Sequence, residues 1–125
     1  MLALLVGCAV MASDATYHPG MWEARALTIG SGVDEAMVAW EAGDRADAAE
    51  TVRMVYAGSF EPELEPVMRE LVGVGEVTEL ELRFGLLAVA MEGRDRDRVT
   101  AAQSALMEPL SAHATQLDEL RAVIR

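Results

Sequence analysis

The stretch that decides the fold is EVTELELRFGLLAVAME, residues 76–92. One set of its apolar side chains recurs at alternating intervals of three and four residues, which is the spacing of a helix that packs in a bundle. This set comprises Val77, Leu80, Phe84, Leu87 and Met91. A second apolar stripe, formed by Leu82, Leu86 and Val89, lies on another face of the same helix. The pattern predicts a helix that is either central in the bundle or in contact with a partner.

Turn residues divide the remainder of the chain into three more helical segments. These segments cover about residues 21–42, 45–71 and 95–124. Gly43 is a natural residue to follow the first segment, and Gly93 to follow the helix over 76–92. The two glycines lie in similar local sequences fifty residues apart, a faint internal duplication that suggests two helical hairpins. The sequence therefore predicts an all-α, four-helix up-down bundle made of two helical hairpins, in a single domain over residues 21–125.

Glycine and proline predict three departures from straight helices. Gly30-Ser31-Gly32 is expected to interrupt the first segment. Pro62 and Pro66 each remove a backbone donor, which predicts a kink or a restart near residues 59–63. Pro109 predicts a further kink in the last segment.

The charge balance narrows the classes of partner. The chain has 125 residues, of which 52% are apolar, enough for one domain with a core of its own. Its 21 acidic residues outnumber 10 basic ones and give a net charge of −11. Nucleic acid is not expected as a partner, because phosphate binding needs a basic face. Three i, i+4 ion pairs are predicted to balance part of the negative charge: Glu65–Arg69, Glu79–Arg83 and Glu92–Arg96.

Residues 1–12, MLALLVGCAVMA, carry no charge and resemble the apolar region of a secretory signal. Two processing routes fit this segment: cleavage after Ala12, or a lipobox at residues 5–8 in which Cys8 is lipidated and becomes the mature N-terminus. The alternative is a buried N-terminal helix with a core cysteine. With export, residues 13–20 form a polar tether. The expected location is then the periplasm or the outer cell surface, with Cys8 as a membrane anchor.

The most unusual stretch is YAGSFEPELEP, residues 56–66. On an α-helix Glu61 and Glu65 lie one turn apart, where like charges repel by roughly 0.2–0.5 kcal/mol unless a cation relieves them. Hard cations such as iron, manganese and calcium bind through such oxygen ligands. Glu81 lies beside the apolar seam of the next helix and can face Glu61 across the bundle. The alternative is a solvated acidic edge, in which Glu65 pairs with Arg69 and the carboxylate of Glu81 stays in water.

His113 falls in the apolar stripe of the last segment. It is either a core histidine bonded within the fold or a further metal ligand or proton-sensing group, since histidine titrates near neutrality. The di-iron sites of ferritin-type bundles need Glu-x-x-His, and neither histidine has a glutamate three residues before it. A ferroxidase centre is therefore not expected. Nucleotide-binding and hydrolase motifs are also missing from the sequence, which predicts no catalytic residues and no enzyme.

These residues together resemble a known helical domain over roughly residues 33–117. The chain is similar to the extracytoplasmic helical domain associated with bacterial high-affinity, oxidase-dependent iron permeases. In that domain one helix ends in Gly-Asp, the next carries A-Y-x-x-G-F-E-x-x-E, and a third carries E-x-x-F before a glycine turn. The matching residues here are Gly43-Asp44, Tyr56, Phe60-Glu61, Glu65 in register or one place off, Glu81, Phe84 and Gly93. Ser59 stands where glycine is usual, and the membrane helices of the permease are absent from this sequence. The resemblance implies a free-standing relative of the accessory domain, with Glu61, Glu65 and Glu81 as iron contacts.

Residues and resemblance together predict an exported accessory protein that assists a membrane iron permease or another envelope protein. It is expected to bind iron or another hard cation through Glu61, Glu65, Glu81 and His113. The alternative is a structural or interaction module with no metal site. In that case the stripe formed by Leu82, Leu86 and Val89 binds another helix, and the acidic side chains only keep the domain soluble.

Overall fold

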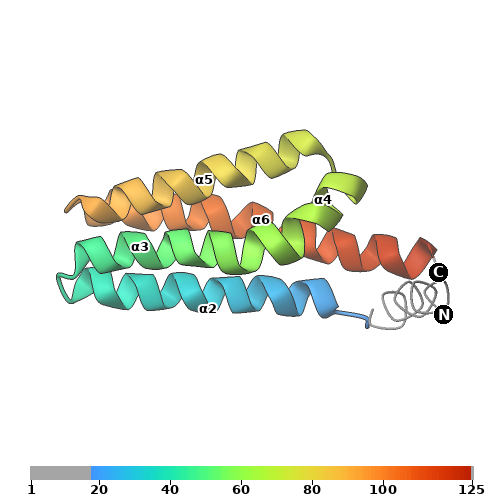
Figure 1. Ribbon diagram of the computed structural model, residues 1–125, viewed down its shortest axis with the longest axis horizontal. Helices are drawn as coiled ribbons and strands as arrows, with labels where there is room; N and C mark the ends of the chain where they lie inside the picture. Colours follow the sequence, from blue (N-terminus) through green and yellow to red (C-terminus); the bar gives the residue numbers. More distant parts are fainter. Residues whose placement is uncertain (1–17, 125) are drawn as a thin grey trace, which may run out of the picture.

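The computed structural model describes residues 18–124, which form an all-helical bundle without any strand (Figure 1). In chain order the elements are α2 (Met21–Glu41), α3 (Arg45–Val55), the π-helix η1 (Tyr56–Leu64), α4 (Glu65–Leu71), α5 (Val74–Glu92) and α6 (Arg96–Ile124). The elements α3, η1 and α4 follow one another directly, so that four helical arms pack together. The predicted all-α fold is confirmed. The signal-like residues 1–12, with Cys8, and most of the tether lie outside the described residues.

The core lies where the inward faces of the four helical arms meet. Helix α2 packs against α3 and α6, and α5 packs against the same two helices. Each arm contributes side chains that are almost completely buried. Examples are Ile29 and Val33 from α2, Val52 from α3, Leu64 from η1, Leu87 and Met91 from α5, and Leu106 and Leu110 from α6. None of the helices within residues 18–124 combines the length and the apolar character that a membrane span requires.

The two apolar stripes of α5 have different environments. The stripe with alternating spacing of three and four is buried, as predicted, from Val77 to Met91. The second stripe, Leu82, Leu86 and Val89, is exposed along its whole length. Helix α5 is therefore covered on one side only by residues 18–124, and its second stripe faces outward from this part of the chain.

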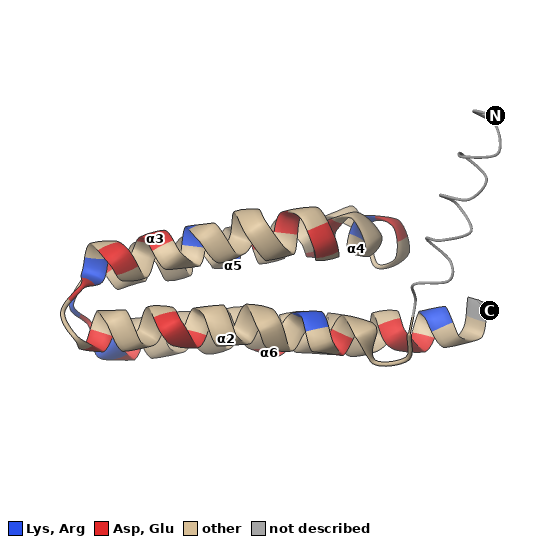
Figure 2. Ribbon diagram, turned by 60° about the horizontal axis from the view of Figure 1, so that its bottom comes forward, with Lys and Arg blue, Asp and Glu red and all other residues tan. Residues whose placement is uncertain are grey.

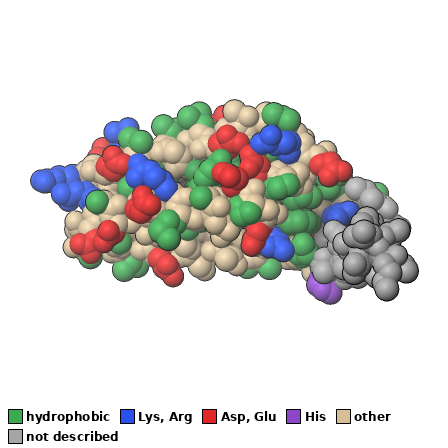
Figure 3. All heavy atoms as spheres, in the orientation of Figure 1, with side chains coloured by type: hydrophobic (Ala, Val, Ile, Leu, Met, Phe, Trp, Pro, Cys, Tyr) green, Lys and Arg blue, Asp and Glu red, His purple; other side chains and the backbone are tan. Residues whose placement is uncertain are grey.

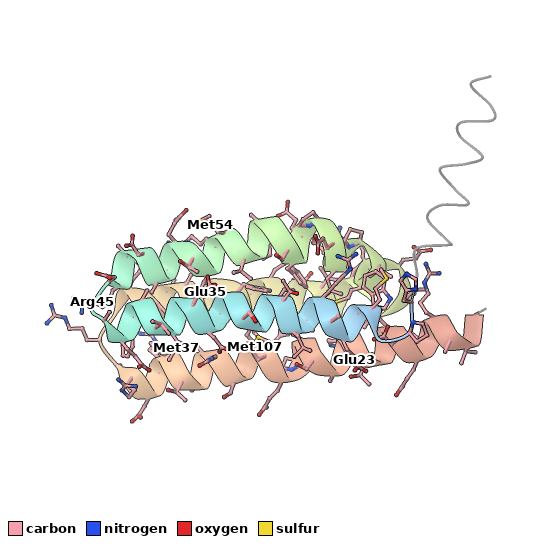
Figure 4. The ribbon with its side chains drawn as sticks, turned by 90° about the horizontal axis from the view of Figure 1, so that it is seen from below. Glu23, Glu35, Met37, Arg45, Met54 and Met107 are labelled. Carbon is pink, nitrogen blue, oxygen red and sulfur yellow. The ribbon has the colours of Figure 1, made fainter. Side chains whose placement is uncertain are left out.

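The predicted interruption at Gly30-Ser31-Gly32 is wrong, because α2 runs unbroken from Met21 to Glu41. Packing explains the two glycines. A Cβ atom on Gly32 would lie 2.4 Å from Cγ2 of Val55, and one on Gly30 would lie 3.3 Å from Cε of Met107. The glycines thus let α3 and α6 approach α2 closely, and this tertiary contact outweighs their low helix propensity. Figure 4 shows Met37 and Met107 between α2 and α6, whereas the exposed Met54 points away from the bundle.

The predicted kink or restart near residues 59–63 takes the form of a wider helical turn. Residues Tyr56–Leu64 adopt π-helical hydrogen bonding, and Pro62 lies inside this element. Pro62 has no N–H, and in an α-helix its ring would clash with the carbonyl group four residues before it. The wider turn accommodates the ring and lets the arm continue into α4. Pro109 likewise lies inside α6, which continues on both sides of it.

Interactions at the helix ends differ in part from the prediction. Gly43 has a φ of 93° in the turn after α2, as expected for a glycine at this position. The predicted pair Glu92–Arg96 does not form, because α5 ends at Glu92 and the turn at Gly93 separates the two side chains. Glu92 instead pairs with Arg53 of α3. Nη1 of Arg96 lies 3.3 Å from Oε1 of Glu41 in α2.

The start of α2 is held by a residue that sequence reasoning did not single out. The buried carboxylate of Asp118 in α6 accepts hydrogen bonds from the backbone N–H groups of Trp22, at 3.2 Å, and Glu23, at 3.0 Å. These are two of the donors that a helix N-terminus leaves without an intrahelical partner. Asp118 therefore caps α2 from the opposite end of the sequence, and no local pattern could have revealed it.

Candidate cation site

The three glutamates that the sequence singles out come from three successive elements. Glu61 lies in η1, Glu65 is the first residue of α4, and Glu81 lies in α5. Figure 2 shows acidic positions spread over the helices and gathered where the arm passes into α4. In Figure 3 acidic side chains gather on the surface between η1 and α5, with a basic group beside them. We call Glu61, Glu65 and Glu81, together with Arg69, the acidic cluster.

Glu65 is the buried member of the cluster. Its side chain is only 11% exposed, and its Oε1 accepts a hydrogen bond of 2.6 Å from Nη2 of Arg69 one turn later. The ion pair predicted between these two residues is therefore confirmed. The same Nη2 atom lies 3.8 Å from Oε1 of Glu81, so one guanidinium group serves two carboxylates. Glu61 is exposed, and its charge is one of those that raise the pKa of Glu81.

The pKa of Glu81 is shifted by burial and by its neighbours in the acidic cluster. It is raised above its ordinary value, first by a side-chain hydrogen bond with Glu65 and then by burial. The negative charges of Glu65 and Glu61 raise it further, whereas Arg69 lowers it. A carboxyl group beside an arginine ordinarily has a lowered pKa. The hydrogen bond, burial and the two negative charges together therefore outweigh the lowering effect of Arg69 on this pKa.

Tyr56 joins the acidic cluster to the aromatic part of the core. Its ring centroid lies 5.8 Å from that of Phe60 and 5.3 Å from that of Phe84, and the two phenylalanine rings lie 5.1 Å apart. Burial raises the pKa of the Tyr56 phenol, and the charges of Glu81, Glu65 and then Glu61 raise it further. Tyr56 therefore stands within the electrostatic reach of all three glutamates. The sequence showed it only as a position matched by the family resemblance.

His113 lies outside this group. It is a half-buried residue of α6, and its Nδ1 atom lies 3.3 Å from Oε1 of Gln116 in the next turn of the same helix. It is not among the charged neighbours that shift the pKa of Glu81 or Tyr56. The structure thus brings three of the four predicted ligands together and leaves the fourth apart.

The cluster is held together by its own arginine. Within residues 18–124, no three Asp, Glu, His or Cys side chains are arranged so that they could hold a metal ion. The guanidinium of Arg69 instead supplies the positive charge between Glu65 and Glu81. A cation from solution would have to displace this group. The Arg69 side chain is 53% exposed.

A surface groove runs from the cluster along the junction of α3 and α5. Its volume is about 440 Å³. Glu81 of the acidic cluster and the neighbouring Tyr56 both line it. The groove is lined by Val52, Arg53, Tyr56, Glu81, Phe84, Gly85, Ala88 and Val89. Val89 belongs at the same time to the exposed stripe of α5. The groove and the stripe therefore form one continuous and mainly apolar surface.

No protein-family model, no curated protein and no solved structure matches this chain.

Proposed function

We propose that this chain is a helical accessory protein that binds iron or another hard cation at the acidic cluster and passes it to a membrane iron permease or another envelope protein. The observation that carries the proposal is that Glu65 of α4 and Glu81 of α5 share the single guanidinium group of Arg69, while the charge of Glu61 in η1 is near enough to raise the pKa of Glu81. The chain has no proposed catalytic residue, because binding and transfer of an ion break no covalent bond.

The chemistry of the cluster favours exchange of a cation. Three carboxylates offer oxygen ligands of the kind that hard cations prefer, and their mutual repulsion falls when a multivalent ion replaces Arg69. Glu61 is exposed to water, whereas the Glu65 side chain is nearly buried and is held by Arg69. An ion held in this way keeps part of its water shell and can leave again. Such reversible binding suits a protein that hands its ion to another.

Three further parts of the proposal come from the sequence. Export and lipidation at Cys8 would place the domain beside a membrane partner. The family resemblance supplies the identity of that partner as an iron permease. We also infer that the bundle follows an up-down path of two hairpins, α2 with α3 and α5 with α6. The three-residue connections at 42–44 and 93–95, and the packing within each pair of helices, support this path.

The alternative function is that of an interaction module without a metal site. The exposed stripe of Leu82, Leu86 and Val89 favours it, because a helix with two apolar faces leaves one of them without a partner in residues 18–124. The two functions are compatible, and separate measurements distinguish them.

Calorimetric titration with ferrous, ferric, manganous and calcium ions tests the cation site. The double variant Glu61→Ala/Glu65→Ala is expected to lose the binding that the wild type shows. The matched control is Glu76→Ala/Glu79→Ala, which removes the same charge from exposed positions of α5. His113→Ala shows whether the imidazole contributes. Equal binding by the wild type and the cluster variant would refute the cation site.

Mass spectrometry of the native N-terminus tests export and anchoring. A diacylglycerol on Cys8 would establish the anchor, and a free Ser13 would establish simple cleavage. An intact Met1 would contradict both.

A further inference from the structure

The groove between α3 and α5 continues into the exposed apolar stripe of α5, as described above. Leu82, Leu86 and Val89 are each about half exposed and follow a spacing of four and three residues. This is the spacing with which a helix presents anchors to a second helix. Single exposed apolar side chains are common on protein surfaces, but three in one stripe beside a groove form a patch that marks an interaction site.

Gly85 gives this surface a particular shape. It lies in the interior of α5 and lines the groove, and a Cβ atom built on it would meet no atom of the described residues within 4 Å apart from its chain neighbours and the adjacent backbone of its own helix. Glycine is the least favourable residue in a helix interior after proline. At Gly32 a close contact with Val55 explains the glycine, but no contact within residues 18–124 requires one at position 85. The open helix backbone at Gly85 offers room for a side chain that comes from outside.

The charge around the groove selects the occupant. Glu81 lines one end, where the acidic cluster carries three glutamates and one arginine. At the other end Arg53 is already paired with Glu92. A second copy of this chain, with its net charge of −11, would bring like charge to the same place. Three half-exposed side chains also supply only a small part of the about 800 Å² per partner that two folded proteins ordinarily bury.

We propose that this surface receives an amphipathic helix of a partner polypeptide, with apolar anchors over Leu82, Leu86 and Val89 and a basic end against Glu81 and Glu61. One anchor side chain enters the groove above Gly85. This inference rests on the proposed accessory role in one respect, because both need a partner polypeptide. It does not need a bound cation.

The test uses a synthetic helical peptide of about 18 residues, long enough to hold some helix alone. It carries leucines at intervals of four and three and two arginines at one end. A matched peptide has glutamates in place of the arginines. Both are titrated into the full chain in metal-free buffer and followed by the amide resonances of the protein. We expect the basic peptide alone to bind, with the largest shifts at Leu82, Gly85 and Val89.

Two variants locate the binding. Gly85→Leu fills the groove at a position with free space, so the fold is retained and binding is expected to fall at least about tenfold. Leu27→Asp changes an exposed apolar residue of α2 and serves as the control that leaves binding unchanged. Equal affinity for both peptides, or unchanged binding by Gly85→Leu, would overturn the proposal. Self-association of the free protein that Leu86→Asp abolishes would also overturn it, in favour of a second copy. Because no metal is present, none of these outcomes bears on the cation site.

Discussion

Replacement of Arg69 by methionine tests whether the acidic cluster stores unbalanced charge. Methionine keeps much of the aliphatic stem and removes the guanidinium, so that Glu65 loses its partner at 2.6 Å. Breaking a fully buried ion pair costs about 3–5 kcal/mol, and an exposed pair contributes about 0–1 kcal/mol. Here the carboxylate is 11% exposed and the arginine 53%. We therefore expect Arg69→Met to lower the free energy of unfolding by about 1.5 kcal/mol at pH 7.

The chain contains a matched control for this measurement. Arg83 and Glu79 form another i, i+4 pair, with a distance of 2.7 Å between Nη2 and Oε1, but here the glutamate is 53% exposed. The variant Arg83→Met is expected to cost only about 0.4 kcal/mol, because water already screens this carboxylate. The two pairs thus share a helical spacing and a chemistry, and they differ in the burial of the glutamate and in the second carboxylate, Glu81, that Arg69 reaches.

Urea denaturation followed by circular dichroism gives both free energies, and a double-mutant cycle isolates the pair. Glu65→Gln/Arg69→Met is expected to recover most of the loss, since the buried charge is then gone. Adding Glu81→Gln to Arg69→Met is expected to recover part of it, because one source of repulsion is removed. Equal costs for Arg69→Met and Arg83→Met, or no recovery by Glu81→Gln, would refute the argument that the cluster is crowded.

Three further outcomes follow from the described contacts. In a Tyr17→Phe background, absorbance titration is expected to place the pKa of Tyr56 above its ordinary value of 10.0. The variant Glu81→Gln should lower this pKa, because it removes one of the negative charges that raise it. An unchanged pKa in this variant would contradict the charge coupling. Because the pKa of Glu81 is raised in the folded state, its contribution to stability is largest at or below its ordinary 4.5 and is lost as the pH rises through the folded value. The variant Glu81→Gln should therefore gain stability relative to the wild type from pH 4.5 toward neutrality, and a gap in urea midpoints that stays constant with pH would argue against this. Asp118→Ala removes the acceptor for two N–H groups of α2 and is expected to lower the free energy of unfolding by about 1–2 kcal/mol in the same assay. An unchanged urea midpoint would show that this cap does not stabilise the fold.

Local patterns predicted the helices well, because their information lies within one turn or one connection. The spacing from Val77 to Met91 identified the buried face of α5, and Gly43 and Gly93 marked the turns. The pattern failed where two helices meet. Gly30 and Gly32 suggest a break when only α2 is considered, and their role appears only when Met107 and Val55 are placed against them.

Of the four predicted ligands the three glutamates lie near one another and His113 lies apart, and the arrangement of the glutamates was not predicted. The i, i+4 spacing revealed the pair of Glu65 and Arg69, since both lie on one helix. It could not reveal that Glu65 is buried or that Arg69 also reaches Glu81, because this contact joins α4 to α5 across a turn. The link of Tyr56 to the glutamates likewise depends on how three elements pack.

The π-helix between α3 and α4 also sets the rotational phase of everything after it. Each residue advances an α-helix by about 100°, so an additional residue in regular α-helical winding would rotate α4 by that amount, whereas a wider turn absorbs the residue. Regular α-helical winding of the same nine residues of η1 would carry Glu65 and Arg69 around the axis, away from Glu81. The glutamates would remain in the sequence with their number unchanged, yet they would no longer meet. For this protein the π-helical winding between Tyr56 and Leu64 therefore matters as much as the identity of its acidic residues.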